Sequence, residues 1–142
     1  MERKPHQGKL EIVKKGWGKE VIFARESAYC GKLLVFNKRS QFSMHFHKNK
    51  DETFYITEGK FQLDWVDTKD ASTKTVFLEI DDTWRIPPMV PHQVTCISHG
   101  GTIIEVSTHD DPEDNDNFRI GKGPSYSLYI PFRCNRTLKK MK

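Results

Sequence analysis

From residue 21 to residue 107 the chain consists largely of short segments in which apolar and polar residues alternate. They lie at residues 21–25, 29–36, 60–66, 76–80, 83–87, 92–97 and 102–107, and within residues 41–59. A period of two is typical of β-strands, and the Gly-, Pro- and Asp-rich stretches between the segments indicate turns. No segment has the period of an amphipathic helix. About eight to ten short strands at this spacing predict an all-β barrel or jelly roll.

The length of 142 residues fits a single domain with a buried core. We expect an N-terminal arm over residues 1–16, a barrel core over about 17–107 and a C-terminal extension over 108–142. The charged N-terminus and the lack of a long apolar run predict a cytoplasmic location without membrane contact. The net charge of +4 comes with basic residues gathered at the two ends and no nucleic-acid-binding motif, so no nucleic-acid partner is expected.

The segment at residues 41–59 carries the strongest functional signal. His45 and His47 are one residue apart, and Glu52 follows five residues later. In a strand both imidazoles lie on one face, and a hairpin turn at residues 48–51 would bring Glu52 back beside them. Two imidazoles and a carboxylate suit a divalent metal with open coordination positions. The alternative is a solvated polar strand face.

The other face of the same segment is apolar. Phe42, Met44 and Phe46 have the opposite parity to the histidines, so they are predicted to point away from them. A contiguous exposed patch of this size is unusual in a monomer. An N-terminal strand or a second subunit must cover it, and we predict a homodimer.

His92 begins a predicted strand after a loop that three prolines stiffen. A barrel can place this side chain opposite the histidine pair, which makes it the natural fourth ligand.

These residues resemble the paired motifs of the cupin superfamily. The first motif appears as His45, His47, Glu52 and Gly59, and the second ends at His92. Met89 stands where a glycine is usual, and Cys96 stands where an asparagine is frequent. The resemblance implies a jelly-roll β-barrel, also called a double-stranded β-helix. It also implies a divalent transition metal (Mn, Fe, Zn or Ni) held by His45, His47, Glu52 and His92.

A narrower resemblance links the chain to the C-terminal cupin domain of type II mannose-6-phosphate isomerases. It rests on WGKE at residues 17–20, the spacing from Gln41 through Ser43 to the metal motif, and Ile104-Glu105-Val106. It implies an isomerase or epimerase of a sugar or sugar phosphate, hence a carbohydrate as the small-molecule ligand. A non-haem metal dioxygenase and a non-catalytic small-molecule-binding protein are the alternatives.

Further candidates follow from these hypotheses. No catalytic residue is assigned, although Glu105 or His109 could supply a base. The cations considered for a phosphate are Lys60, Arg85 and Arg119, and the residues considered for the cavity wall are Gln41, Phe54, Phe61 and Trp84. The acidic stretch at 108–117 lacks EF-hand spacing and is predicted to be a solvated loop. One more strand is expected at 126–132.

Overall fold

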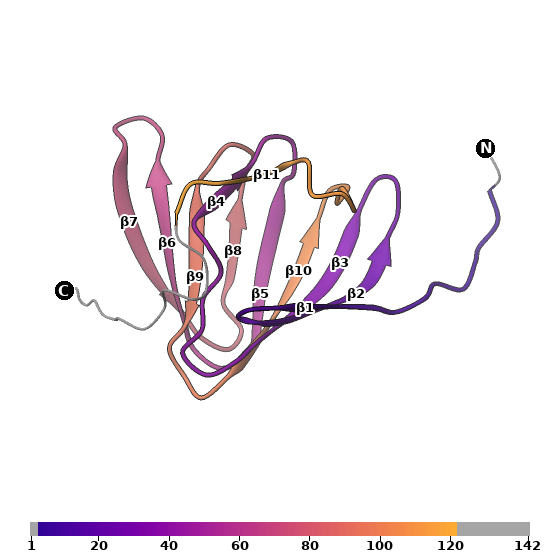
Figure 1. Ribbon diagram of the computed structural model, residues 1–142, viewed down its shortest axis with the longest axis horizontal. Coiled ribbons are helices and arrows are strands. Elements are labelled where there is room, and N and C mark those ends of the chain that lie inside the picture. The colour runs from indigo at the N-terminus through magenta and orange to yellow at the C-terminus, as the bar shows by residue number, and fades with distance from the viewer. Residues whose placement is uncertain (1–2, 122–142) are drawn as a thin grey trace.

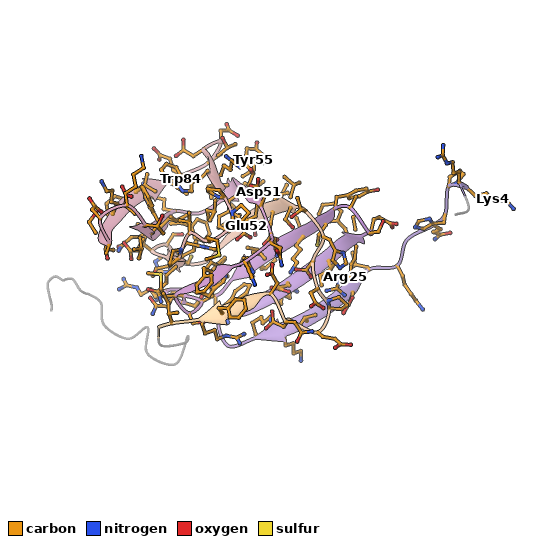
Figure 2. The ribbon with its side chains drawn as sticks, turned by 90° about the horizontal axis from the view of Figure 1, so that it is seen from above. Lys4, Arg25, Asp51, Glu52, Tyr55 and Trp84 are labelled. Carbon is orange, nitrogen blue, oxygen red and sulfur yellow. The ribbon has the colours of Figure 1, made fainter. Side chains whose placement is uncertain are left out.

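The computed structural model describes residues 3–121, which form eleven β-strands and no helix (Figure 1). The strands are β1 (Glu11–Lys15), β2 (Gly18–Arg25), β3 (Cys30–Phe36), β4 (His45–His47), β5 (Glu52–Glu58), β6 (Phe61–Asp67), β7 (Ser72–Leu78), β8 (Thr83–Ile86), β9 (His92–Cys96), β10 (Gly101–Ser107) and β11 (Asn117–Arg119). Residues 3–10 extend away from the sheets, with Lys4 at the far end (Figure 2). Among the described residues no helix could span a membrane. The expected strand at 126–132 lies outside them.

The strands form two antiparallel sheets. The six-stranded sheet has the order β1-β2-β3-β10-β5-β8, and the five-stranded sheet has the order β11-β4-β9-β6-β7. The chain passes between the sheets several times, since β4 lies in one sheet while its sequence neighbours β3 and β5 lie in the other. Two facing antiparallel sheets connected in this way form a jelly roll. The prediction of an all-β jelly-roll fold is confirmed.

The predicted hairpin between the histidine pair and Glu52 is wrong. β4 belongs to the five-stranded sheet, where it pairs with β9 and β11, whereas β5 belongs to the six-stranded sheet. The turn at 48–51 therefore crosses between sheets, and Glu52 faces the histidines across the interior. Alternation of residue types identified both strands but could not show which partners they pair with.

Several strands change from apolar to polar along their inward faces. On β10 the inward side chain changes from Ile103 to Glu105, and on β9 it changes from Val94 to His92. β3 follows the same rule: Leu34 lies toward the hydrophobic core and Lys32 lies at the polar end of the interior. One end of the interior is thus a hydrophobic core and the other end is a polar site.

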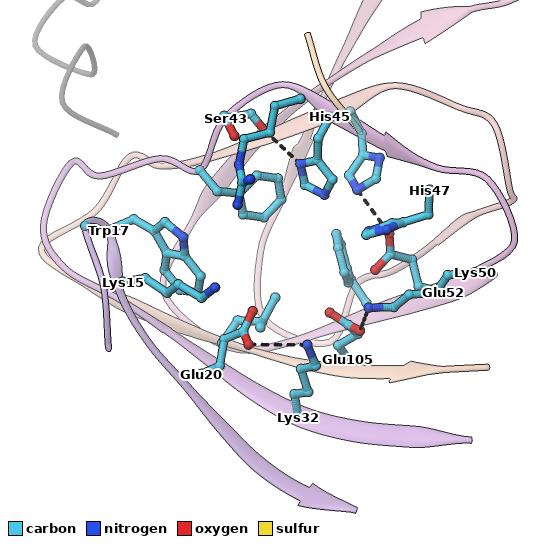
Figure 3. Close-up of a pocket in the computed structure, with 16 residues that line it drawn as sticks. Lys15, Trp17, Glu20, Lys32, Ser43, His45, His47, Lys50, Glu52 and Glu105 are labelled. Atoms are coloured by element: carbon cyan, nitrogen blue, oxygen red, sulfur yellow. Dashed lines mark hydrogen bonds and ion pairs between the residues drawn. The ribbon is translucent and has the colours of Figure 1, made fainter. Parts of the chain in front are cut away.

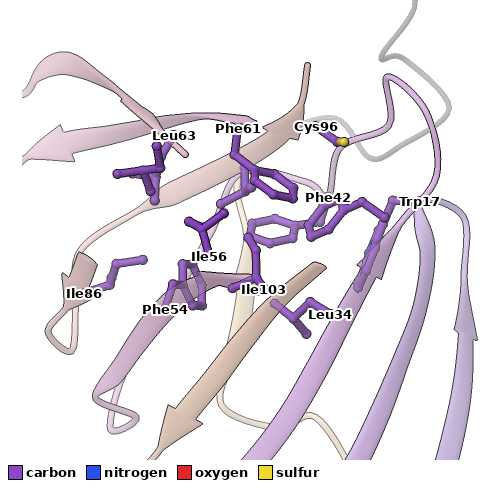
Figure 4. Packing of buried hydrophobic residues seen from close by; sticks show 13 residues of the cluster. Trp17, Leu34, Phe42, Phe54, Ile56, Phe61, Leu63, Ile86, Cys96 and Ile103 are labelled. Carbon is purple, nitrogen blue, oxygen red and sulfur yellow. The ribbon is translucent and has the colours of Figure 1, made fainter. Parts of the chain in front are cut away.

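The hydrophobic core combines both sheets around a group of aromatic rings (Figure 4). Trp17 stacks on Phe36 with ring centroids 4.6 Å apart, and Phe61 meets Phe36 edge-on at 5.1 Å. Each fully buried side chain of this size stabilises the fold by roughly 2–3 kcal/mol through the area it removes from water. Core residues such as Phe42 and Phe54 also line the cavity of the polar site and hold it in place.

The prediction that Phe42 points away from the histidines is also wrong. Phe42 is buried in the core, and its ring meets that of His45 edge-on with centroids 4.9 Å apart. The regular strand begins only at His45, and the segment before it makes an isolated bridge at Gln41. Because the backbone between them is not a regular strand, the period of two does not hold there.

The outward face of β4 is covered by the chain itself. Phe46 stacks on Phe118 of β11 with centroids 5.1 Å apart. The backbone carbonyl of Met44 accepts hydrogen bonds from the amides of Ile120 and Gly121. The apolar face from which the homodimer was predicted therefore has an intrachain partner.

Candidate metal centre

The structure brings three histidines together at the polar end of the interior (Figure 3). His45 and His47 come from β4, and His92 comes from β9, directly opposite His45 in the strand register. All three are buried, and one ring nitrogen of each lies within 4.8 Å of the others. Such a cluster could hold a metal ion.

Each histidine is oriented by a hydrogen bond from Nδ1 to a backbone carbonyl. His45 Nδ1 lies 2.8 Å from the Ser43 oxygen, and His92 Nδ1 lies 3.0 Å from the Val90 oxygen. His47 Nδ1 lies 3.1 Å from the oxygen of Asp116. A carbonyl only accepts, so Nδ1 carries the proton and Nε2 keeps its lone pair. This arrangement is typical of imidazoles that bind metals.

Glu52 approaches the cluster from the six-stranded sheet. Its Oε2 lies 3.1 Å from His92 Nε2 and 3.5 Å from His47 Nε2. With the His92 proton on Nδ1, neither atom can donate to the other, and Glu52 Oε2 and His92 Nε2 are buried polar atoms without a hydrogen-bond partner among the described residues. Buried polar atoms are normally satisfied. A cation between them would satisfy both, so the donor set fits a divalent metal.

The electrostatics of the cluster favour the forms that bind a metal. Burial lowers the pKa of His45 well below its usual value, and the neighbouring histidines lower it further. Burial also lowers the pKa of His47. Burial alone would raise the pKa of Glu52, but the contact with His92 and the nearby positive charges outweigh it, so the pKa is lowered. Neutral imidazoles and an ionised carboxylate are the states that coordinate.

A cavity of about 220 Å³ lies against the cluster. It is lined by Lys15, Gly16, Trp17, Glu20, Lys32, Leu34, Phe42, Ser43, His45, His47, Lys50, Glu52, Phe54, His92, Glu105 and Arg119. Histidines occupy one side and paired lysines and glutamates the other (Figure 3). A small ligand can therefore meet the metal ligands and a charged wall together.

The charged wall contains two buried lysines. Lys50 Nζ lies 3.0 Å from Glu105 Oε2 and 2.9 Å from Asp110 Oδ1. Lys32 Nζ lies 3.3 Å from Glu20 and 3.2 Å from the same Asp110 oxygen. Burial opposes the charge on Lys50, but the carboxylates around it, above all Glu105, raise its pKa. Both lysines are charged, and carboxylates hold them in place.

Sequence reasoning missed these lysines and the role of the acidic stretch. A signal existed, since Lys32 falls on the inward parity of an otherwise apolar strand. The acidic stretch is not only a solvated loop. Asp110 binds both buried lysines, and the Asp116 carboxylate accepts hydrogen bonds from the amides of Lys48, Asn49 and Lys50. No local pattern reveals such contacts, which join residues sixty or more positions apart.

The cavity-wall predictions are mixed. Phe54 lines the cavity. Phe61 is fully buried in the core and does not line it. Gln41 accepts a hydrogen bond from Thr95, and Trp84 packs near Trp65 with centroids 6.4 Å apart, so neither of these two lines the cavity.

The structure also separates the charged candidates. Glu105 lines the cavity, whereas His109 is exposed and contacts the backbone oxygen of Glu26. Arg119 lines the cavity. Lys60 does not, and Arg85 forms an exposed bidentate pair with Asp51 outside it.

Solved structures of similar fold include larger proteins. The capsular polysaccharide assembling protein CapF from Staphylococcus aureus has a TM-score of 0.69 at 14% identity, covering 80% of this chain and 33% of that chain. Oxalate decarboxylase from Bacillus subtilis has a TM-score of 0.67 at 17% identity, covering 80% and 30%. The Lactobacillus farciminis oxalate decarboxylase formate complex has a TM-score of 0.65 at 15% identity, covering 80% and 34%. The chain spans about a third of each, and identities this low show the fold alone.

Sequence comparison adds the family. A search of curated proteins finds no match. The family model of the cupin domain matches residues 32–107, which include all four candidate ligands. This match covers more than half of the 142 residues, so the chain belongs to the cupin domain family.

Proposed function

We propose that this cupin binds a divalent transition metal through His45, His47, Glu52 and His92 and acts on a small oxygen-containing ligand. The observation that carries the proposal is the shared orientation of the three imidazoles. Each Nδ1 is held by a backbone carbonyl, which leaves the Nε2 lone pairs for a cation, together with Glu52 Oε2, which has no hydrogen-bond partner among the described residues. A structural neighbour, the Bacillus subtilis oxalate decarboxylase, has Mn(II) centres. Manganese, iron, zinc and nickel all accept such a donor set.

We further propose isomerisation or epimerisation of a sugar or sugar phosphate. A bound metal would polarise a carbonyl and a neighbouring hydroxyl of such a ligand. Glu105 lines the same cavity and is buried, and its Oε2 has no hydrogen-bond partner among the described residues despite the nearby Lys50 ammonium. It is the side chain best placed to move a proton between adjacent carbons. Lys50 and Asp110 fix its surroundings.

An assay of hexose and pentose phosphates with manganese or zinc added tests the activity. We expect metal-dependent interconversion that Glu105→Gln reduces by about a hundredfold or more, the usual contribution of a positioned base. Absence of interconversion by the metal-loaded protein would contradict it. Substrate-dependent oxygen uptake with iron would instead favour the dioxygenase, because the four-ligand set leaves positions open for O₂. Tight ligand binding without turnover would favour a non-catalytic binding protein.

The homodimer also remains a proposal, now supported by a different surface. On the outer face of the six-stranded sheet, the ring of Phe23 lies over Gly31, whose register partner is Val106. Phe23 and Val106 are 49% and 53% exposed. A second copy of the chain could cover this apolar surface. Light scattering tests it: a dimer that Phe23→Lys dissociates is expected, and a monomeric wild type would contradict it.

A further inference from the structure

Two cationic side chains reach the cavity from edge strands of opposite sheets. Lys15 ends β1, the edge of the six-stranded sheet, and Arg119 ends β11, the edge of the five-stranded sheet. Arg119 lies directly opposite His45 in the register, so both side chains lie on the same face. Both cations line the cavity, yet neither lies within the stretch matched by the family model.

These two cations differ from the other two that line the cavity. Lys32 and Lys50 are buried against carboxylates at 3.3 Å or less. The side chain of Lys15 forms no ion pair or hydrogen bond with any described residue. Arg119 has a single 3.4 Å contact with Asp114, and both side chains of that pair are more than half exposed. An exposed contact of this kind binds weakly. The positive charges of Lys15 and Arg119 are therefore available to a ligand.

The charge balance of the cavity points the same way. Four cationic side chains line it, against three carboxylates, those of Glu20, Glu52 and Glu105. Outside this lining, Asp110 contacts Lys32 and Lys50, but it also pairs with Arg25, so an excess of positive charge remains. A divalent metal on the histidine cluster would add to this excess. A concave site with net positive charge raises the local concentration of anions. A cavity of about 220 Å³ suits a small anion.

We propose that Lys15 and Arg119 form an anion-binding subsite, and that the ligand is a small oxygen-rich molecule carrying a carboxylate or a phosphate. The anionic group binds the two cations, while hydroxyl or carbonyl oxygens reach the histidine cluster. Identifying the ligand as one that also binds a metal rests on the proposed function. The anion-binding subsite itself does not depend on a metal, because the side chains of Lys15 and Arg119 form it. Lys or Arg paired with such groups forms charge-assisted hydrogen bonds.

Three probes that share one carbon skeleton test the subsite: glycerol, glycerol 3-phosphate and glycerate. Dissociation constants would be measured by NMR titration of the zinc-loaded and the metal-free protein, with metal content measured on the same samples. The test variant is Lys15→Gln/Arg119→Gln. Its control is Lys14→Gln/Lys19→Gln, which removes the same charge from an exposed register pair on the opposite face.

We expect an anionic probe to bind the wild type about tenfold tighter than glycerol, a preference that the test variant loses and the control keeps. Preference for glycerol 3-phosphate identifies a phosphate ligand, and preference for glycerate identifies a carboxylate. Equal binding of all three probes, or the same loss in both double variants, would overturn the subsite. If the wild type binds no zinc but its metal-free form still prefers the anionic probes, the proposed metal centre is contradicted and the anion-binding subsite is supported.

Discussion

The backbone oxygen of Asp116 lies 3.1 Å from Nδ1 of His47, a residue 69 positions earlier in the chain. The Asp116 carboxylate also accepts hydrogen bonds from three consecutive amides, those of Lys48, Asn49 and Lys50, at 3.0–3.1 Å. One residue thus orients a candidate metal ligand and caps the turn that follows it. Asp116 lies outside the stretch matched by the family model, so the C-terminal part of the described chain completes the site.

Replacing Asp116 should weaken metal binding without removing a ligand. In Asp116→Ala the turn at 48–50 loses its acceptor, and the backbone oxygen of residue 116, which the substitution keeps, is no longer anchored against Nδ1 of His47. We expect metal affinity to fall about tenfold, as for other groups that orient metal ligands. Asp116→Asn, which keeps one acceptor oxygen, should recover part of it. Competition with a chelating dye measures both. Unchanged affinity, or an equal loss in the exposed Glu113→Ala control, would show that Asp116 does not act through His47.

The metal-free protein should lose stability as the pH falls. The pKa values of His45 and His47 are lowered in the folded state, so below about pH 6.5 protons bind preferentially to the unfolded chain. The free energy of unfolding should therefore be smaller at about pH 5.5 than at about pH 7.5. Urea titrations at both values measure it. His45→Gln should reduce this difference in the free energy of unfolding, and the exposed His109→Gln should not. The same difference in all three proteins would show that His45 does not cause the pH dependence.

Replacing Met89 with glycine should stabilise the fold. Met89 has φ of 72°, in the left-handed region that side chains disfavour, at the position where the cupin motif usually has glycine. Its amide donates to the His47 oxygen at 2.7 Å, which holds this conformation. We expect Met89→Gly to raise the free energy of unfolding by about 0.5–1 kcal/mol after the flexibility of glycine is allowed for. Met89→Ala, which keeps the Cβ, should bring no such gain. Chemical denaturation compares them, and equal stability of the two variants would contradict the account.

Lys50 should be a major contributor to stability. Its side chain is only 6% exposed and lies between Glu105 and Asp110. Lys50→Met would leave the buried Glu105 carboxylate without its cation, which costs about 3–5 kcal/mol. Adding Glu105→Gln should recover part of this loss, because one unpaired charge disappears. A double-mutant cycle measured by denaturation tests the coupling, and strictly additive effects would show that the pair does not interact.

How far the sequence predicted the site depends on the range of each contact. Alternation predicted the all-β fold, and alternation and spacing made His45, His47, Glu52 and His92 candidate ligands, because strand parity is local. The pairing of β4 was misjudged, because which strands become neighbours is a long-range property. Phe42 was misplaced because the backbone before His45 is irregular. The role of Asp116 depends on contacts across more than sixty residues, for which the sequence carries no local pattern.

Metal analysis of purified protein tests the central claim most directly. The wild type would be compared with His47→Ala and His92→Ala, with His109→Ala as a control because that histidine is exposed and lies outside the cluster. We predict a single equivalent of a divalent transition metal in the wild type and the control, and its loss from both cluster variants. A wild type that holds no metal even after reconstitution, or cluster variants that retain it, would contradict the proposed metal centre.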